Sequence, residues 1–448
     1  MTRTLLTLIL CWVPMVAAAQ TSDRRGVSLE EALKLCATNN QDLAAARAQH
    51  AQVQAQARRV WAAILPEISV SGSLVHTSAP SKLDLGDFVD LVGGVYQLPQ
   101  QNPALIPEPI FITNTNSAYG TVLVSQILFT PQLLLIPAAS SGTEAARLGS
   151  LEAREQVLLA TAKVFLGLEG LVQLETAARE AEGVALKREK DIRAQMEVGM
   201  AVEVALLRAQ SETAQARNTL AQLAGTREQL LGLLEALTGE AVRPLEAAPK
   251  PDFGVAAAEG TEPWNATYLL QAQAKEANAT EAFRTYDRLA WLPTLVAQAK
   301  GNYSSNTGFT GEPFSYDLIL GLNIPLYDRG VRYANQREND AKAAEQKAKL
   351  QSSRQKAKAN WVATRANLQA AEATLAQAQS QATLAARAQK QLESAVSAGV
   401  STALELSDID NKRFLAASAA AQARSQVEIR KVELAAAEGR LAKVVGLE

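Results

Sequence analysis

Two stretches of this 448-residue chain repeat one another around a glycine, 200 positions apart. The first is "MEVGMAVEVALLRAQ", residues 196–210, and the second is "VSAGVSTALELSDID", residues 396–410. Gly199 therefore aligns with Gly399, and each interrupts a long run of helix-forming residues. This pattern predicts two helical hairpins with tips near 199 and 399, in which both glycines adopt the positive φ that a tight turn needs.

The helical runs beside these glycines are longer than a compact domain requires. Helix is predicted over 136–197 and 201–237 in the first half, and over 331–397 and 402–443 in the second. A helix of about 60 residues is about 90 Å long at 1.5 Å per residue, which suits a strut or the wall of a tube. The abundant Ala and Gln and the 5% of aromatic residues also favour long helices over a broad β core.

Proline and glycine divide each half into a helix, two strands and a hairpin. The predicted segments are 1–19, a signal peptide; 20–66, the N-terminal helix of repeat 1 with helix over 28–64; 67–130, two strands with a long outer loop over 82–116; 131–238, the first hairpin; 239–262, a linker; 263–293, the helix that opens repeat 2; 294–327, two strands; and 328–448, the second hairpin.

The first twenty residues, "MTRTLLTLILCWVPMVAAAQ", have the pattern of a secretory signal peptide. Arg3 supplies the positive charge, an apolar run follows, and Ala17 to Ala19 form a small-residue cleavage site. The alternative is an ordinary buried N-terminal helix. Cleavage after Ala19 would leave Cys36 as the single cysteine, so no internal disulfide is expected. No later stretch is predicted to hold the roughly 20 apolar residues of a membrane helix.

Four short stretches alternate between apolar and polar residues, as half-exposed strands do. They are "ISVSGSL" (68–74), "YGTVLVSQIL" (119–128), "TLVAQAKGNY" (294–303) and "SYDLILGLNIP" (315–325). A soluble sandwich is the usual context, but four strands among such long helices build little of one. Their length of about ten residues suits tilted membrane strands. Because four strands leave two open edges, which lipid does not tolerate, the sequence predicts a barrel shared among several copies.

Aromatic residues stand where the predicted strands meet helices: Trp61, Phe129, Trp291 and Tyr327. Prolines lie beside them, at 66, 131, 293 and 325. Such aromatics suit a membrane–water interface belt, and packing at a domain junction is the alternative.

Composition and motifs exclude several function classes. The net charge of −2 shows no basic surface for nucleic acid. The two histidines, His50 and His76, belong to no His-Glu-x-x-His motif, and there is neither a cysteine pair nor a phosphate-binding loop. We therefore expect no catalytic residues, no metal and no cofactor. Met196 and Met200 near the first tip are interpreted as packing residues.

The sequence resembles the outer-membrane efflux protein family, the TolC-type export ducts, over essentially the whole mature chain. "LYDRGVR" (326–332) is similar to the family's aromatic–Asp–x–Gly–x–Arg helix start, here Tyr327, Asp328, Gly330 and Arg332. "LFTPQLL" (128–134) resembles a variant without the Gly and Arg. The glycine turns match the family's tip motif.

This resemblance implies a mostly α fold with a membrane portion: long helical hairpins forming an α-barrel, and four strands per chain contributing to a 12-stranded barrel in a homotrimer. It implies an outer-membrane channel of a Gram-negative bacterium that extends into the periplasm. The channel would receive cargo from an inner-membrane transporter through a periplasmic adaptor protein, for efflux or for type I protein secretion. A pore-less periplasmic coiled-coil scaffold is the alternative from another class.

The resemblance also gives a role to two acidic residues at the second tip. Glu405 and Asp408 are three positions apart on one helix face, and three copies would form stacked acidic rings that favour cations. A solvated helix face is the alternative. Some family members close the tunnel through charged links between tip helices, but Ala205 and Ser401 stand at those positions here.

Overall fold

A computed structural model describes residues 24–83, 110–111, 113–245, 248–254, 262–307 and 311–447 of the chain. The predicted signal peptide at 1–19, most of the predicted outer loop at 82–116 and part of the predicted linker at 239–262 lie outside these residues.

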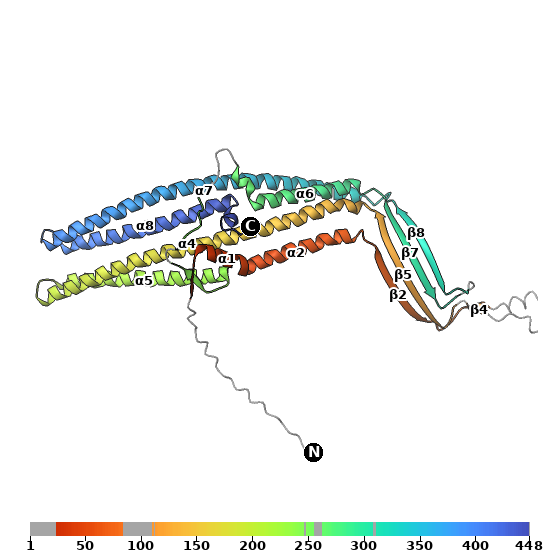
Figure 1. Ribbon diagram of the computed structural model, residues 1–448, viewed down its shortest axis with the longest axis horizontal. Helices are drawn as coiled ribbons and strands as arrows, with labels where there is room; N and C mark the ends of the chain where they lie inside the picture. The colour runs from red at the N-terminus through yellow and green to blue at the C-terminus, as the bar shows by residue number, and fades with distance from the viewer. Residues whose placement is uncertain are drawn as a thin grey trace, which may run out of the picture. The chain divides into compact units, whose positions relative to one another are not determined.

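Each half of the chain contains helix, strands and a helical hairpin, in that order (Figure 1). In the first half the elements are β1 (Arg25–Val27), α1 (Leu29–Asn39), α2 (Gln41–Ala62), β2 (Glu67–His76), β3 (Lys82–Leu83), β4 (Ile110–Phe111), β5 (Asn116–Phe129), η3 (Pro131–Leu135), α4 (Ile136–Glu197), α5 (Glu203–Thr238) and β6 (Val242–Pro244). In the second half they are η4 (Pro263–Ala266), α6 (Tyr268–Leu289), β7 (Thr294–Ser304), β8 (Phe314–Asn323), α7 (Val331–Ser397), α8 (Ala403–Ala437) and α9 (Leu441–Val444).

The helix predicted over 28–64 is two helices that meet at Asn40. Asn40 has an extended backbone, with φ −66° and ψ 128°, so α1 ends there. Its side-chain oxygen accepts hydrogen bonds from the backbone N–H of Asp42 (2.9 Å) and of Leu43 (3.1 Å), which caps α2. The amide nitrogen of Asn40 donates to the carbonyl of Leu237 on α5 (3.0 Å). A tertiary contact therefore fixes this break, and the helical periodicity does not reveal it.

The C-terminal return helix is also shorter than the predicted 402–443. Gly439 has a positive φ of 65° and separates α8 from α9. The N–H of Arg440 donates to the carbonyl of Ala435 (2.9 Å), which closes the helix end.

One helical region is apolar enough to cross a membrane by length and composition, contrary to the prediction that none would be. Within Pro131–Glu197, an 18-residue window reaches a mean hydropathy of 1.6, and 39% of it is buried. The core helix of a soluble protein passes the same test. Here α4 contributes Leu158, Ala162 and Phe165 to the main hydrophobic core, which accounts for its apolar composition.

The four predicted strands form one antiparallel sheet with the order β2-β5-β7-β8. The register pairs Val70 with Val122, Val122 with Gly301, and Gly301 with Tyr316, so these four residues share one face. The stretch predicted over 119–128 became β5, the longest of the four strands, at 14 residues. A register shift between Ile127 and Phe129 bends its end.

Two further strand pairs were not predicted. β1 pairs in parallel with β6, which lies in the predicted linker, and β3 pairs with β4 at the ends of the predicted outer loop. Strands of two or three residues leave no periodic pattern in a sequence, so their partners alone define them.

The chain divides into two compact units, and each repeat contributes to both. Unit 1 takes the described residues up to Ala44 with Ala153–Trp264 and Ala357–Glu448, and unit 2 takes Ala45–Glu152 and Asn265–Lys356. The two sequence repeats therefore do not correspond to the two compact units.

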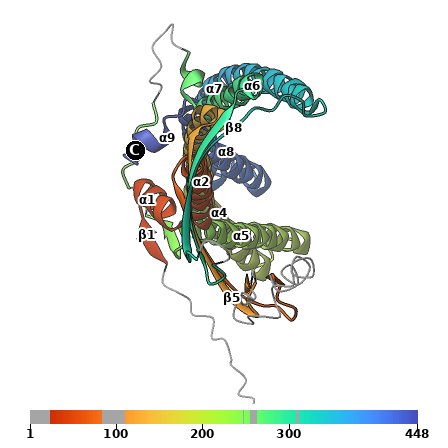
Figure 2. The ribbon, with the colours of Figure 1, turned by 90° about the vertical axis from the view of Figure 1, so that its right-hand side faces the viewer.

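The main hydrophobic core lies in unit 1. It joins α1, α4, α5, α8 and α9 through Leu33, Phe165, Leu234, Val432 and Leu441, each at most 1% exposed. Figure 2 shows β1 beside α1 in this unit. Burial of each such side chain contributes roughly 2 kcal/mol, so this cluster anchors the bases of both hairpins.

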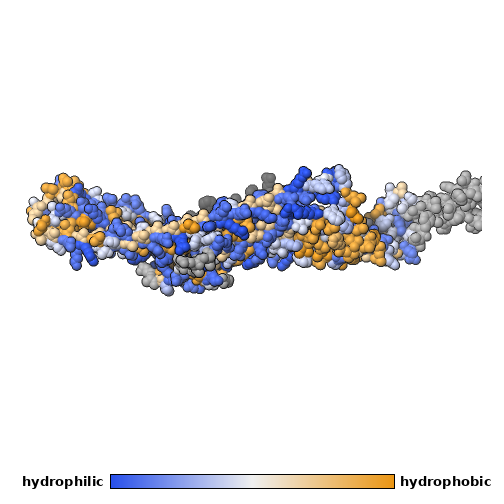
Figure 3. All heavy atoms as spheres, turned by 90° about the horizontal axis from the view of Figure 1, so that it is seen from above, coloured by the Kyte–Doolittle hydropathy of each residue, from blue (hydrophilic) through white to orange (hydrophobic). Residues whose placement is uncertain are grey.

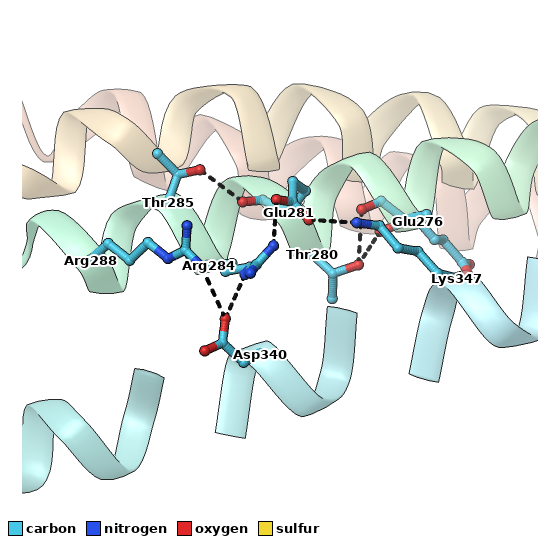
Figure 4. A network of polar contacts seen from close by, with 9 residues as sticks. Glu276, Thr280, Glu281, Arg284, Thr285, Arg288, Asp340 and Lys347 are labelled. Carbon is cyan, nitrogen blue, oxygen red and sulfur yellow. Dashed lines mark hydrogen bonds and ion pairs between the residues drawn. The ribbon is translucent and has the colours of Figure 1, made fainter. Parts of the chain in front are cut away.

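In unit 2, ion pairs join α6 to α7 (Figure 4). Arg284 of α6 pairs with Asp340 of α7, and Glu281 pairs with Lys347 of α7 at 3.3 Å. Arg284 also bonds Glu281 within α6 at 3.0 Å, so the four side chains form one network. Exposed pairs of this kind contribute little energy singly, but together they fix how α6 lies along α7.

Candidate functional sites

The two hairpin tips have the same backbone geometry. Gly199 has a φ of 74° and Gly399 a φ of 72°, as the sequence predicts. The N–H of Gly399 donates to the carbonyl of Val396 (3.0 Å), and that of Val400 to Ala395 (2.9 Å). Gly199 and its successor make the equivalent two bonds at the first tip. This is the Schellman ending, in which a left-handed residue satisfies the last carbonyls of a helix.

The tips differ in how the return helices begin. At the second tip, the Thr402 hydroxyl accepts from the N–H of Glu405 (3.3 Å), and the Glu405 carboxylate accepts from the N–H of Thr402 (3.0 Å). This is a complete capping box. At the first tip, Val202 occupies the cap position and makes no side-chain hydrogen bond.

Glu405 and Asp408, the residues of the predicted acidic rings, therefore have different surroundings. Both Glu405 and Asp408 are exposed on α8. The backbone and side chain of Thr402 donate to the Glu405 carboxylate and hold its pKa below the ordinary value. Asp408 forms no hydrogen bond or ion pair with the described residues.

A charged cluster farther from the tips joins the two hairpins, and sequence reasoning missed it. Arg188 of α4 binds Glu212 of α5 at 3.1 Å and also pairs with Asp410 of α8. The side chains of Arg188 and Asp410 are each 13% exposed. Gln389 of α7 donates to Asp410 (2.9 Å), and Ser407 donates to Glu212 (2.8 Å). Side chains from all four long helices thus form one hydrogen-bonded network around the Arg188 guanidinium, which we call the Arg188 cluster.

A cavity of about 250 Å³ lies beside this cluster, between α4, α5 and α8. Small residues of α4, among them Ala177, Ala181 and Ala185, form much of its wall, with Phe414 of α8 opposite. The short run of alanines is a sequence signal for a close helix contact, but alanine is too common in this chain for the signal to stand out.

At Gly170, α4 and α8 cross very closely. A Cβ on Gly170 would lie 2.7 Å from the Ser425 side chain, so only glycine fits without a shift of the neighbour. The Ser425 hydroxyl donates to the carbonyl of Leu166 (2.9 Å). The hairpins are thus held at this crossing and at the Arg188 cluster.

The four-stranded sheet of unit 2 has two different faces. One is apolar and exposed in this chain: Ile68, Val70, Leu74, Leu318 and Leu320 are 69% to 88% exposed. Figure 3 shows hydrophobic residues gathered over the strands, and again at the hairpin tips. The register places most of the strands' polar residues on the opposite face, which we call the polar face, among them Glu67, Ser69, Ser71, Ser73, Thr121, Ser125, Gln298, Lys300, Asn302, Ser315 and Asp317.

Aromatic residues occur at both ends of the sheet. The four predicted belt residues, Trp61, Phe129, Trp291 and Tyr327, lie at its helical end and are 39% to 84% exposed. Sequence reasoning missed a second group at the loop end, where Tyr303 and Phe314 contact each other with ring centroids 5.1 Å apart. The sequence did contain a signal for this second group, because Tyr303 and Phe314 stand at strand ends, as the predicted belt residues do.

The predicted strand-to-helix motif starts α7. The Asp328 carboxylate accepts from the N–H of Gly330 (3.2 Å) and of Arg332 (3.1 Å), which caps the helix. The Arg332 guanidinium binds Asp328 at 3.3 Å and donates to the carbonyl of Pro325 (3.0 Å). Gly330 has a φ of 84°. Tyr327 is 84% exposed, so it lies outside this hydrogen-bonded turn.

Residues 267–440 match the family model described as outer membrane efflux protein. This range covers α6 through α8 and the second pair of sheet strands. Among curated proteins, none matches the chain.

Several solved structures share the fold. A membrane protein from Pseudomonas aeruginosa matches with a TM-score of 0.76 and 18% identity, over 92% of this chain and 93% of its own. The CmeC outer membrane channel of Campylobacter jejuni matches with 0.75 and 16%, over 92% and 86%. The outer membrane protein VceC of Vibrio cholerae matches with 0.73 and 14%, over 92% and 96%. The predicted mostly α fold of long helical hairpins with four sheet strands is thereby confirmed, and the family resemblance is confirmed over residues 267–440.

Proposed function

We propose that this chain, whose residues 267–440 belong to the outer membrane efflux protein family, forms an outer-membrane channel that is the exit duct of a multi-component efflux system. Cargo would pass from an inner-membrane transporter through a periplasmic adaptor protein into the duct and then outside. The sheet of unit 2 carries this proposal, because it has one apolar face, one polar face and two open edges.

The edges require further copies of the chain. Among the described strands, β2 pairs only with β5 and β8 only with β7. Backbone groups cannot stay unpaired in lipid, so β8 of one copy pairs with β2 of the next until the ring closes. Three copies, as the resemblance implies, give twelve strands.

The faces then take opposite environments. Lipid covers the apolar face, and the polar face lines a water-filled pore. The aromatic groups at the two ends of the sheet lie at the two membrane–water interfaces, where amphipathic rings are favoured. A pore-less scaffold would leave Val70, Leu74 and Leu318 in water, 76% to 88% exposed, at a large free-energy cost.

The hairpin tips form the periplasmic end. Exposed apolar side chains there, Val198, Met200 and Val400, are 69% to 80% exposed and would contact the adaptor. Glu405 and Asp408, repeated by the copies, would form acidic rings that attract cations. Because such a wall need not hold cargo tightly, export of proteins and of small molecules are both compatible with these surfaces.

Conductance in planar bilayers tests the proposal. The membrane-extracted oligomer is compared with Arg188→Gln, which releases the link between the hairpins and so guards against a closed resting state. We expect discrete single-channel steps from the wild type, the variant or both. An inserted, intact oligomer that conducts in neither form would refute the duct and favour the pore-less scaffold.

A further inference from the structure

The polar face carries few charges, and two of them, Glu67 and Lys300, have no hydrogen bond or ion pair with any described residue. Glu67, Lys300 and Asp317 are its charged residues within β2, β5, β7 and β8. Lys300 and Asp317 stand directly opposite each other on β7 and β8. The Asp317 carboxylate accepts from the Asn302 amide (3.1 Å). The Lys300 ammonium has no hydrogen bond or ion pair with any described residue.

This arrangement separates two charges that could have neutralised each other. Asn302 in turn accepts from the Thr121 hydroxyl (3.4 Å), so a hydrogen-bonded row crosses three strands and holds the carboxylate along the sheet. Lys300 is flanked on the other side by Leu123, its partner on β5, which offers no acceptor. The ammonium therefore has water and passing solutes as its remaining partners.

We propose that Lys300 and Asp317 are a second selectivity element of the duct, within the membrane portion and separate from the acidic tip. Lys300 attracts anionic groups of the solute and Asp317 attracts cationic ones. This inference rests on the proposed function, because it requires the polar face to line a pore.

The size of a twelve-stranded pore makes the effect of Lys300 and Asp317 on ion selectivity measurable. A ring of twelve strands lies between small barrels filled by side chains and the open channels of sixteen or more strands. Its wall charges therefore act on the pore axis over a distance comparable with the Debye length, which is about 10 Å at 0.1 M salt and about 3 Å at 1 M. Selectivity set by Lys300 and Asp317 should be evident at low salt and largely screened at high salt.

Reversal potentials under a salt gradient centred on 0.1 M test the proposal. We expect Lys300→Gln to raise the cation-to-anion permeability ratio roughly twofold and Asp317→Asn to lower it by a similar factor. Both ratios should return towards the wild-type value near 1 M salt. Lys349→Gln is the matched control, since Lys349 lies on α7, outside the sheet, and pairs with Glu345.

A cysteine variant separates charge from folding. In Lys300→Cys, a positively charged methanethiosulfonate restores the charge in the assembled channel, and a negatively charged one reverses it. Cys36 is fully buried, so it does not compete for the reagent. We expect the two reagents to shift the permeability ratio in opposite directions.

Two results would overturn the inference while leaving the duct intact. One is a cation-to-anion permeability ratio at low salt that is unchanged in both Lys300→Gln and Asp317→Asn. The other is a shift of this ratio in the same direction with the positively and the negatively charged reagent. Where the wild type is closed, the same variants are recorded in the Arg188→Gln background, and an intact oligomer that conducts in neither background would instead count against the proposed function.

Discussion

Arg188 pairs with Asp410 across the two hairpins, 222 positions apart in sequence. The same guanidinium binds Glu212 at 3.1 Å, so one side chain holds α5 and α8 against α4. Both members of the Arg188–Asp410 pair are largely removed from water, which strengthens their attraction and makes loss of one partner costly.

We therefore expect Arg188→Gln to lower the free energy of unfolding by about 2 kcal/mol and to increase the open time of the channel. Thermal unfolding and single-channel recording measure the two effects. Arg217→Gln is the matched control, because Arg217 also joins α5 to α4, through Glu182, but is 62% exposed. Its loss should cost under about 1 kcal/mol. Equal effects from both variants would show that the Arg188 cluster has no special role.

The glycines at the tips predict a backbone effect. A Cβ at Gly199 or Gly399 meets no atom within 4 Å, so Gly→Ala there introduces strain from the positive φ without a clash. Each substitution should cost about 1 kcal/mol. Gly183→Ala is the control: it lies within α4, also in open space, and should stabilise the helix by up to about 1 kcal/mol. Chemical denaturation measures all three. The strain argument fails if the tip variants are as stable as the Gly183 variant.

The different caps of the two return helices predict opposite responses to substitution. Thr402→Ala removes the capping box and should destabilise the start of α8 by about 1 kcal/mol, whereas Val202→Ser should stabilise the start of α5. Amide exchange in the first turn of each helix reports the change locally. Slower exchange in Thr402→Ala than in the wild type would contradict this assignment.

The Glu405 cap also predicts a dependence on pH. Hydrogen bonds from Thr402 lower the pKa of Glu405 below its ordinary value of 4.5. A lowered carboxylate pKa stabilises the folded state fully above about pH 4.5, and this contribution disappears as the pH falls through the lower folded-state value. We expect protection of the Thr402 amide to be constant from pH 7 to 5 and to decrease below that. In Glu405→Gln this decrease in the protection of the Thr402 amide should be absent.

The two faces of the sheet predict a sharp contrast between neighbouring residues. Val70→Arg places a charge on the apolar face and should cost about 2–4 kcal/mol near the centre of the bilayer. Ser71→Arg places the same charge on the polar face and should be tolerated. Recovery of oligomer from the membrane fraction distinguishes them. If Ser71→Arg disrupts assembly as much as Val70→Arg, the polar face does not line water.

The acidic tip gives a final prediction. Asp408 has no partner among the described residues, so Asp408→Asn should lower cation selectivity without loss of stability. Glu405→Ala should lower cation selectivity and also the stability of α8, because this side chain caps that helix. Glu393→Gln, on the exposed surface of α7, is the control. Reversal potentials unchanged in Asp408→Asn would remove Asp408 from the conduction path.

Local features of the sequence were sufficient for much of this fold. The helix predicted over 331–397 matches α7 in full, and both glycine turns are where the repeat places them. The alternating pattern also identified all four strands of the sheet. These features depend on residues within one or two turns of each other, where periodicity and backbone preference act directly.

Long-range contacts decided the rest. Asn40 divides the first helix because Leu237 offers it an acceptor, and Arg188 binds Asp410 because two hairpins bring distant helices together. The small strands β1 and β6 exist only as a pair. The sequence by itself determined the helices, the turns and the two-faced strands, since their energies are local. Only the tertiary structure decided which charges meet and which, like the Lys300 ammonium, are left without a partner, because those choices depend on the register between segments far apart in the chain.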